Sequence, residues 1–219
     1  MAVVVSAPPT LRERVVEQLK SAVLAGEFTL DRTYTVPEFA KQFGVSATPM
    51  REAVLDLVKE SLLFTVPGRG FRIQNDPLDV VMSVAQARNL IEIPVSIDAA
   101  AFLEPTDFTA LTEMADAMLE YAAVDDVHAY LRTDLEFHRL TIERHPNALL
   151  VEMVEYLRAR ARVHLLPMLG RPGMFLEPAR EHLALIDALR SGDATAIGEV
   201  VNSHIHRVVH YCRQGITPG

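Results

Sequence analysis

The fold can be predicted from one stretch of sequence, Gly44-Val45-Ser46-Ala47-Thr48-Pro49-Met50-Arg51-Glu52-Ala53-Val54. It has the pattern of a tight turn followed by the start of a helix. Gly44 can take the positive φ that ends a preceding helix, and the hydroxyl of Ser46 can cap the next one. Pro49 fits the first turn, where the helix needs no N–H group. The helix should bury one apolar face, made by Val54, Leu55, Leu57 and Val58.

The amino end of this helix has the composition of a DNA-reading element. Thr48, Arg51 and free backbone N–H groups would lie together there, and a helix N-terminus is a site for anions, phosphate included. Small polar residues and an arginine are also what a recognition helix presents to a major groove. The rest of this half predicts helices over 11–25 and 36–43, and β-like runs over 62–66 and 70–73.

Three helices and a hairpin make a winged helix-turn-helix. The hairpin turn is Pro67-Gly68-Arg69, so Arg69 lies at the tip, where it can enter a minor groove or meet a phosphate. The alternative is a small three-helix domain in which the turn is only a turn, because many helical domains contain this shape.

The same residues resemble the DNA-binding domain of the GntR family of bacterial transcription regulators. The resemblance covers about residues 11–74 and rests on 45–53 and on 67–70. It implies a homodimer on a palindromic DNA operator. The positions that match the family's DNA contacts are Ser46, Thr48, Arg51, Arg69 and Gly70.

The chain departs from the usual family pattern at three places. The family usually has arginine where this chain has Ala47, Pro-Gly where it has Leu30-Asp31, and glycine where it has Ser61. The change at Ala47 removes one phosphate or base contact, which bears on operator sequence and affinity more than on DNA binding itself.

Charge and histidine divide the chain into two parts. Residues 1–76 hold 9 Lys+Arg and 9 Asp+Glu, whereas residues 77–219 account for the whole net charge of −8 and for all 8 histidines. The lone cysteine, Cys212, excludes an intrachain disulfide and is typical of a reducing compartment. No apolar run is long enough for a membrane span, and the first residues make a poor signal peptide. We expect a cytoplasmic protein with domains over 8–75 and 78–213, separated by a hinge at Asn75-Asp76-Pro77.

The second part predicts an all-helical bundle. Turn residues and prolines separate six or so helical segments, and no stretch has the pattern of a strand. The expected segments are 78–103 with a break or kink at Pro94, a helix from Pro105, one capped by Asp125 or Asp126 through 133–144, 149–165, 178–190 and 194–212, with a loop over 167–172.

Four side chains on three of these helices form a candidate metal site. Asp134 and His138 lie one turn apart on one helix face, and His182 and His204 come from two later helices. One carboxylate and three imidazoles suit Zn²⁺, Ni²⁺ or another first-row divalent ion. On local spacing alone, an Asp-x-x-x-His pair is usually a pair on a helix surface.

These positions also resemble the effector domain called FCD, of the FadR subfamily and in its VanR-like six-helix form, over about residues 78–213. The matching motifs are 134–138, 181–182 and 203–205. In many members the matching aspartate and three histidines hold a metal inside the bundle. We expect the remaining histidines to lie at the surface or around the metal ligands without binding the metal; they are His128, His145, His164, His206 and His210. His206 and His210 form an i,i+4 pair of their own, which imitates the spacing of metal ligands on a helix.

Arg88 matches an arginine that commonly faces the central cavity of the FCD domain. Together with a metal, a guanidinium there would suit a small carboxylate effector. The alternative is an ion pair between Arg88 and Glu92, its i+4 neighbour.

These features predict a mainly helical protein that acts as a metabolite-responsive transcription regulator, in this family most often a repressor. One alternative is a metalloenzyme, because an Asp-His₃ site with an open position can activate water. No His-Glu-x-x-His motif supplies a general base, however. The other alternative is a regulator whose pocket binds an acid without metal.

Overall fold

The computed structural model describes residues 10–29, 32–60, 62–73, 78–164 and 173–215. Among them the Cα positions group into two compact units, one of residues 10–23 and 28–73 and the other of residues 24–27 and 78–215. The predicted hinge at 75–77, the loop at 167–172, and the family departures at Leu30-Asp31 and Ser61 lie outside the described residues, as do both ends of the domain predicted over 8–75.

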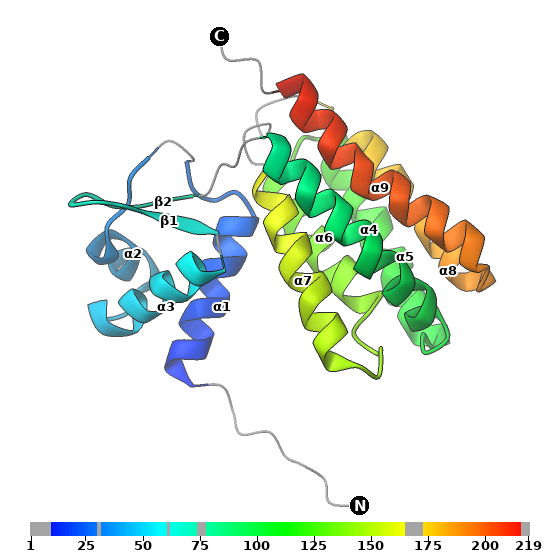
Figure 1. Ribbon diagram of the computed structural model, residues 1–219, viewed down its shortest axis with the longest axis horizontal. Coiled ribbons are helices and arrows are strands. Elements are labelled where there is room, and N and C mark those ends of the chain that lie inside the picture. The colour runs from blue at the N-terminus through cyan, green and yellow to red at the C-terminus, as the bar shows by residue number, and fades with distance from the viewer. Residues whose placement is uncertain (1–9, 30–31, 61, 74–77, 165–172, 216–219) are drawn as a thin grey trace, which may run out of the picture. The chain divides into compact units, whose positions relative to one another are not determined.

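The first unit is a winged helix-turn-helix, as predicted (Figure 1). Strands β1 and β2 pair antiparallel, with Val66 opposite Gly70 beside the hairpin turn. Tyr34 adds a bridge to this hairpin, because its N–H and C=O each bond to the backbone of Phe71 at 2.8 Å. The elements are α1 (Leu11–Leu24), α2 (Val36–Phe43), α3 (Ala47–Lys59), β1 (Leu63–Val66) and β2 (Gly70–Ile73).

The turn between α2 and α3 forms as its residues require. Gly44 lies in the left-handed region with a φ of 66° and closes α2, and the N–H of Val45 bonds back to Ala40 at 3.0 Å. Ser46 occupies the N-cap position of α3, but its side chain makes no capping hydrogen bond. The prediction that the Ser46 hydroxyl caps this helix is therefore wrong.

The core of the first unit is apolar and fully closed. Phe39, Met50 and Leu57 are each 0% exposed. Leu55, which was expected on the buried face of α3, is 46% exposed. Successive residues of a helix are about 100° apart, so Leu55 lies well around from its buried neighbour Val54.

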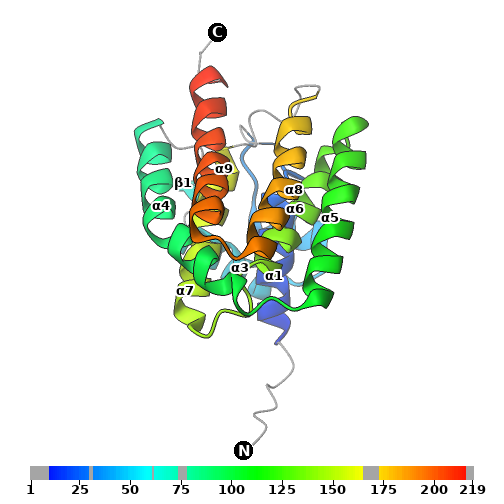
Figure 2. The same cartoon turned by 90° about the vertical axis from the view of Figure 1, so that its right-hand side faces the viewer.

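The second unit consists, in the described residues, of six helices (Figure 2). α4 packs against α7 and α9, α5 packs against α6 and α8, and α8 packs against α9. No helix in these residues is long and apolar enough to cross a lipid bilayer. The helices are α4 (Leu78–Ala100), α5 (Pro105–Ala123), α6 (Val127–Leu140), α7 (Ala148–Arg162), α8 (Leu176–Ser191) and α9 (Ala194–Gly215).

Pro94 and the end of α6 test two details of the sequence expectation. Of the predicted break or kink at Pro94, the break is wrong, because Pro94 lies inside a continuous α4. α6 ends at Leu140 instead of near 144. At the amino end of α6, the Asp126 side chain accepts a hydrogen bond from the N–H of Ala129 at 3.1 Å. This cap sets the residue at which the helix begins.

Candidate functional site

The structure brings the four candidate ligands together inside the helical bundle. Asp134 and His138 come from α6, His182 from α8 and His204 from α9. One ligand atom from each residue lies within 4.8 Å of those of the other three.

The atoms that converge are three imidazole Nε2 atoms and one carboxylate oxygen. Nε2 of His138 lies 3.1 Å from Nε2 of His204 and 3.2 Å from Nε2 of His182. Oδ1 of Asp134 lies 3.1 Å from Nε2 of His182 and 3.5 Å from Nε2 of His138. Nitrogen ligands about 2.0–2.1 Å from a tetrahedral zinc ion are about 3.3 Å apart, so these separations fit a bound divalent metal.

Burial keeps these imidazoles neutral. It lowers the pKa of His182 and of His204 to about 4, and it lowers the pKa of His138 well below its usual range. The charge of Arg158 lowers all three pKa values further. Neutral imidazoles have a free lone pair at pH 7, which is the state that a metal ligand needs.

Charged side chains surround the four residues. Arg162 of α7 forms a buried ion pair with Oδ2 of Asp134, whereas His138 and His182 lie near Oδ1. Glu181 contacts Nδ1 of His204 at 3.3 Å and also pairs with Arg207. No local pattern in the sequence indicates this role of Arg162, because its partner is 28 residues away in the chain.

Arg88 forms the ion pair that was the alternative to an effector contact. Its Nε and Nη2 donate to the two carboxylate oxygens of Glu92 at 2.8 and 3.0 Å. Arg158 of α7 reaches the same carboxylate at 2.6 Å. All three side chains are buried or nearly so. Burial alone would raise the pKa of Glu92, but the charges of Arg158 and Arg88 outweigh it and hold the pKa below its ordinary value.

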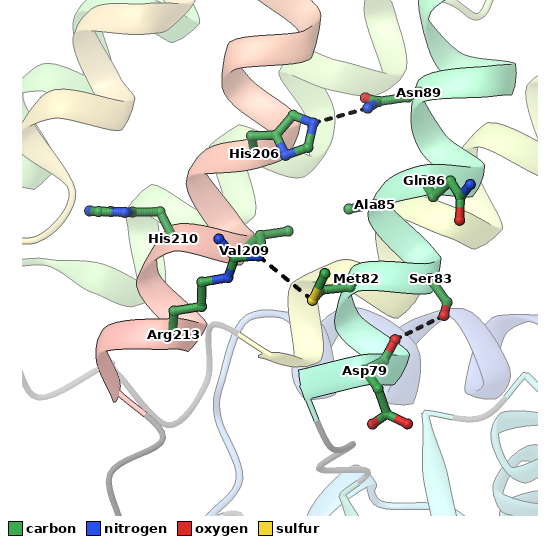
Figure 3. Close-up of a pocket in the computed structure, with 10 residues that line it drawn as sticks. All are labelled: Asp79, Met82, Ser83, Ala85, Gln86, Asn89, His206, Val209, His210 and Arg213. Atoms are coloured by element: carbon green, nitrogen blue, oxygen red, sulfur yellow. Dashed lines mark hydrogen bonds between the residues drawn. The ribbon is translucent and has the colours of Figure 1, made fainter.

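The other histidines do not join the cluster. His145 and His164 are buried, which excludes the surface position, one of the two alternatives expected for them. His206 on α9 forms a side-chain hydrogen bond with Asn89 on α4, at 3.0 Å. His206 and His210 line an open groove of about 680 Å³ between these two helices (Figure 3). In the described residues, the group around Asp134 is the one cluster with metal-ligand geometry.

The candidate DNA-binding residues lie on the outside of the first unit. Ser46, Thr48 and Arg51 are exposed at the amino end of α3, and Arg69 is exposed at the hairpin turn. Gly70 has a packing role, because a Cβ there would lie 2.1 Å from the carbonyl oxygen of Tyr34.

Ion pairing separates the cations of the first unit into two sets. Arg12, Lys20, Arg32 and Lys59 pair with carboxylates. Arg72 is half-buried and donates to the hydroxyl of Thr33 at 2.9 Å. Within residues 10–73 as described, the exposed cations outside any ion pair are Arg14, Lys41, Arg51 and Arg69.

Two protein-family models match the chain. The model for bacterial regulatory proteins of the gntR family matches residues 11–73, and the model for the FCD domain matches residues 83–207. The second match covers more than half of the chain and includes all four candidate metal ligands.

Relatives and solved structures agree with these matches. The HTH-type transcriptional repressor RspR of Escherichia coli K12 is 26% identical over 183 residues, covering 81% of this chain and 78% of that protein. The HTH-type transcriptional regulator McbR of the same strain is 24% identical over 186 residues, covering 84% of each. The structure of E. coli McbR/YncC superposes with a TM-score of 0.85 at 22% identity, covering 94% of this chain and 99% of that chain. At this identity the superposition establishes the shared fold.

Proposed function

The chain belongs to the GntR family of bacterial regulatory proteins and carries an FCD domain, and from this premise we propose that it is a repressor controlled by a small organic acid. A transcription regulator of this family is not an enzyme, so the metalloenzyme alternative is set aside. We assign DNA binding to residues 8–75, and effector binding, metal binding and dimerisation to residues 78–213.

The observation that carries the sensing half is the convergence of three Nε2 atoms and Oδ1 of Asp134, which all lie within 4.8 Å of one another and of which four pairs are 3.1 to 3.5 Å apart. All three imidazoles are neutral at pH 7, because burial lowers their pKa values. Zn²⁺ or Ni²⁺ suits this donor set. Such a metal would supply a Lewis-acid position for one oxygen of a carboxylate effector.

The buried charges near this site favour an anionic effector. Three guanidinium groups, of Arg88, Arg158 and Arg162, face two carboxylates, of Glu92 and Asp134. One positive charge is therefore left over before any metal is counted. Arg88 would have to share its guanidinium between Glu92 and the effector, so its role as an effector ligand is a proposal that rests on this excess.

DNA binding is proposed for the exposed surface around α3 and the hairpin. Arg51 and Arg69, which have no ion-pair partner in the described part of the chain, can meet phosphate or base edges. So can the Ser46 hydroxyl, which does not cap α3, and the amino end of that helix. Dimerisation would place two such surfaces on the half-sites of a palindromic operator. The name of the relative RspR, a repressor, favours the same direction of control.

Effector binding must favour one arrangement of the dimer over another in order to weaken operator binding. A coupling of about 1–3 kcal/mol is enough for a useful response. The test is a mobility-shift assay with the DNA upstream of the protein's own gene, in the presence of small organic acids, with and without Zn²⁺ or Ni²⁺. We expect one acid to release the DNA only when metal is present. Release by the acid in metal-free protein would favour the acid-sensing regulator that needs no metal.

A further inference from the structure

Glu181 makes a contact that the proposed site does not by itself require. It precedes His182 on α8, and it reaches across to α9, where its Oε2 lies 3.3 Å from Nδ1 of His204. Its Oε1 forms an ion pair with Arg207, which follows His204 by one helical turn. The carboxylate therefore contacts two side chains on the same side of α9.

This contact fixes the proton of His204. The same carboxylate is held in an ion pair with the guanidinium of Arg207, so it faces His204 as an anion. An ionised carboxylate only accepts hydrogen bonds, so Nδ1 of His204 must be the donor. A neutral imidazole has one N–H, which leaves Nε2 of His204 unprotonated. That Nε2 is the atom that lies 3.1 Å from Nε2 of His138.

His204 is also the ligand that most needs to be held. Its side chain is 16% exposed, whereas those of His138 and His182 are 5% and 0% exposed. No carboxylate contacts Nδ1 of these two histidines within the described chain. The most exposed of the three rings is thus the one with a charged acceptor behind it.

We propose that Glu181 is a positioning residue for the metal, holding the His204 ring with its unprotonated Nε2 turned into the cluster, while Arg207 holds Glu181 in place. The inference rests on the proposed metal site. Carboxylates that accept from the outer nitrogen of a ligating histidine orient the ring and raise its basicity, and their loss typically weakens metal binding by about 10–100-fold.

The test is a Zn²⁺ titration of the untagged full-length protein against a competing chelator. We expect Glu181→Ala to weaken Zn²⁺ binding by about 10–100-fold. Glu181→Gln should have a smaller effect, because its amide oxygen can still accept from Nδ1. The matched control is Glu177→Ala on the same helix, since Glu177 is exposed and, among the described residues, pairs only with Arg180. This control should bind as wild type does.

A second measurement reports the tautomer without metal. In ¹⁵N-labelled metal-free protein, NMR should show His204 protonated at Nδ1 in wild type and as a mixture of tautomers in Glu181→Ala. If wild type binds Zn²⁺ and Glu181→Ala binds it equally well, the positioning role is overturned. If wild type binds no divalent metal, the proposed site fails instead, and the tautomer then decides: an unchanged His204 in the variant would overturn this inference too. Glu181→Gln, which keeps the side-chain volume, supplies both readouts if the alanine variant does not fold.

Discussion

The two guanidinium nitrogens of Arg88 that face Glu92 each meet a different oxygen of its carboxylate, Nε at 2.8 Å and Nη2 at 3.0 Å. Arg158 adds a third cationic contact at 2.6 Å. The Glu92 side chain is 0% exposed, so its negative charge is compensated wholly by these two neighbours and not by water. Removing that charge would leave two buried guanidinium groups without their partner.

Glu92→Gln should therefore destabilise the protein at pH 7 by about 3–5 kcal/mol, as for other broken buried ion pairs. The pKa of Glu92 is lower in the folded chain than the ordinary value of 4.5. The stabilisation is therefore fully present above about pH 4.5 and is lost as the pH falls through the folded-state pKa. Urea unfolding of both proteins between pH 7 and pH 3.5 measures this, with the exposed Glu199→Gln as the control. A difference in stability that does not shrink in acid would contradict the assignment.

Metal content distinguishes the cluster from the pair of His206 and His210. His204→Ala removes one converging Nε2, whereas His210→Ala removes a histidine of the separate groove between α4 and α9. We expect wild type and His210→Ala to retain one divalent ion per chain and His204→Ala to lose most of it. The measurement is elemental analysis of protein purified without a histidine tag and dialysed against metal-free buffer. Equal metal in all three proteins would exclude this site.

Gly70 in the hairpin should be needed for the close approach of two backbone segments. Gly70 has a φ of +134°, and an added Cβ would lie 2.1 Å from the backbone oxygen of Tyr34. Gly70→Ala should break the Tyr34–Phe71 bridge and lower the melting temperature clearly. Gly68→Ala is the matched control, because Gly68 also has a positive φ, +69°, but no described residue lies within 4 Å of the added Cβ. Thermal unfolding followed by circular dichroism should show the larger loss for Gly70→Ala, and equal losses would mean that the close approach has little effect.

Local patterns predicted the parts of the fold that depend on neighbours in the chain. The positive φ of Gly44 and the strand at Gly70 follow from turn chemistry and alternation. The Ser46 capping hydrogen bond and the burial of Leu55 were wrong, because the final hydrogen bonding and facing of a side chain depend on its three-dimensional surroundings.

The candidate site shows the same division. Helical spacing placed Asp134 and His138 on one face, but only the resemblance to FCD domains joined them to His182 and His204 from later helices. The ion pair of Asp134 with Arg162 has no sequence signature, because the contact joins two helices. The contact between Glu181 and His204 could be found only from the packing of α8 against α9.

Arg51 should contribute directly to operator binding. It is exposed on α3 and has no ion-pair partner in the described residues. If Arg51 contacts a base, Arg51→Ala should weaken operator binding by about 1–3 kcal/mol and relax the sequence specificity at one position. If Arg51 contacts a phosphate, the variant should lower the slope of log K against log salt by about one. Mobility shifts at several salt concentrations measure both. Lys59→Ala is the control, because Lys59 lies in the last turn of α3 and pairs with Asp56. Equal binding by wild type and Arg51→Ala would argue against α3 as the recognition helix.

Ala47 allows the opposite test, a gain of binding. It is the first residue of α3 and is exposed, and it stands where the GntR family usually has arginine. Ala47→Arg places a cation beside the free N–H groups at the helix end, where phosphates bind. The variant should bind DNA more tightly and should steepen the dependence of log K on log salt by about one unit, because one more counterion is released. Ala47→Gln adds length without charge and should leave the slope unchanged. A slope that is the same for Ala47→Arg and wild type would mean that the amino end of α3 does not face the DNA backbone.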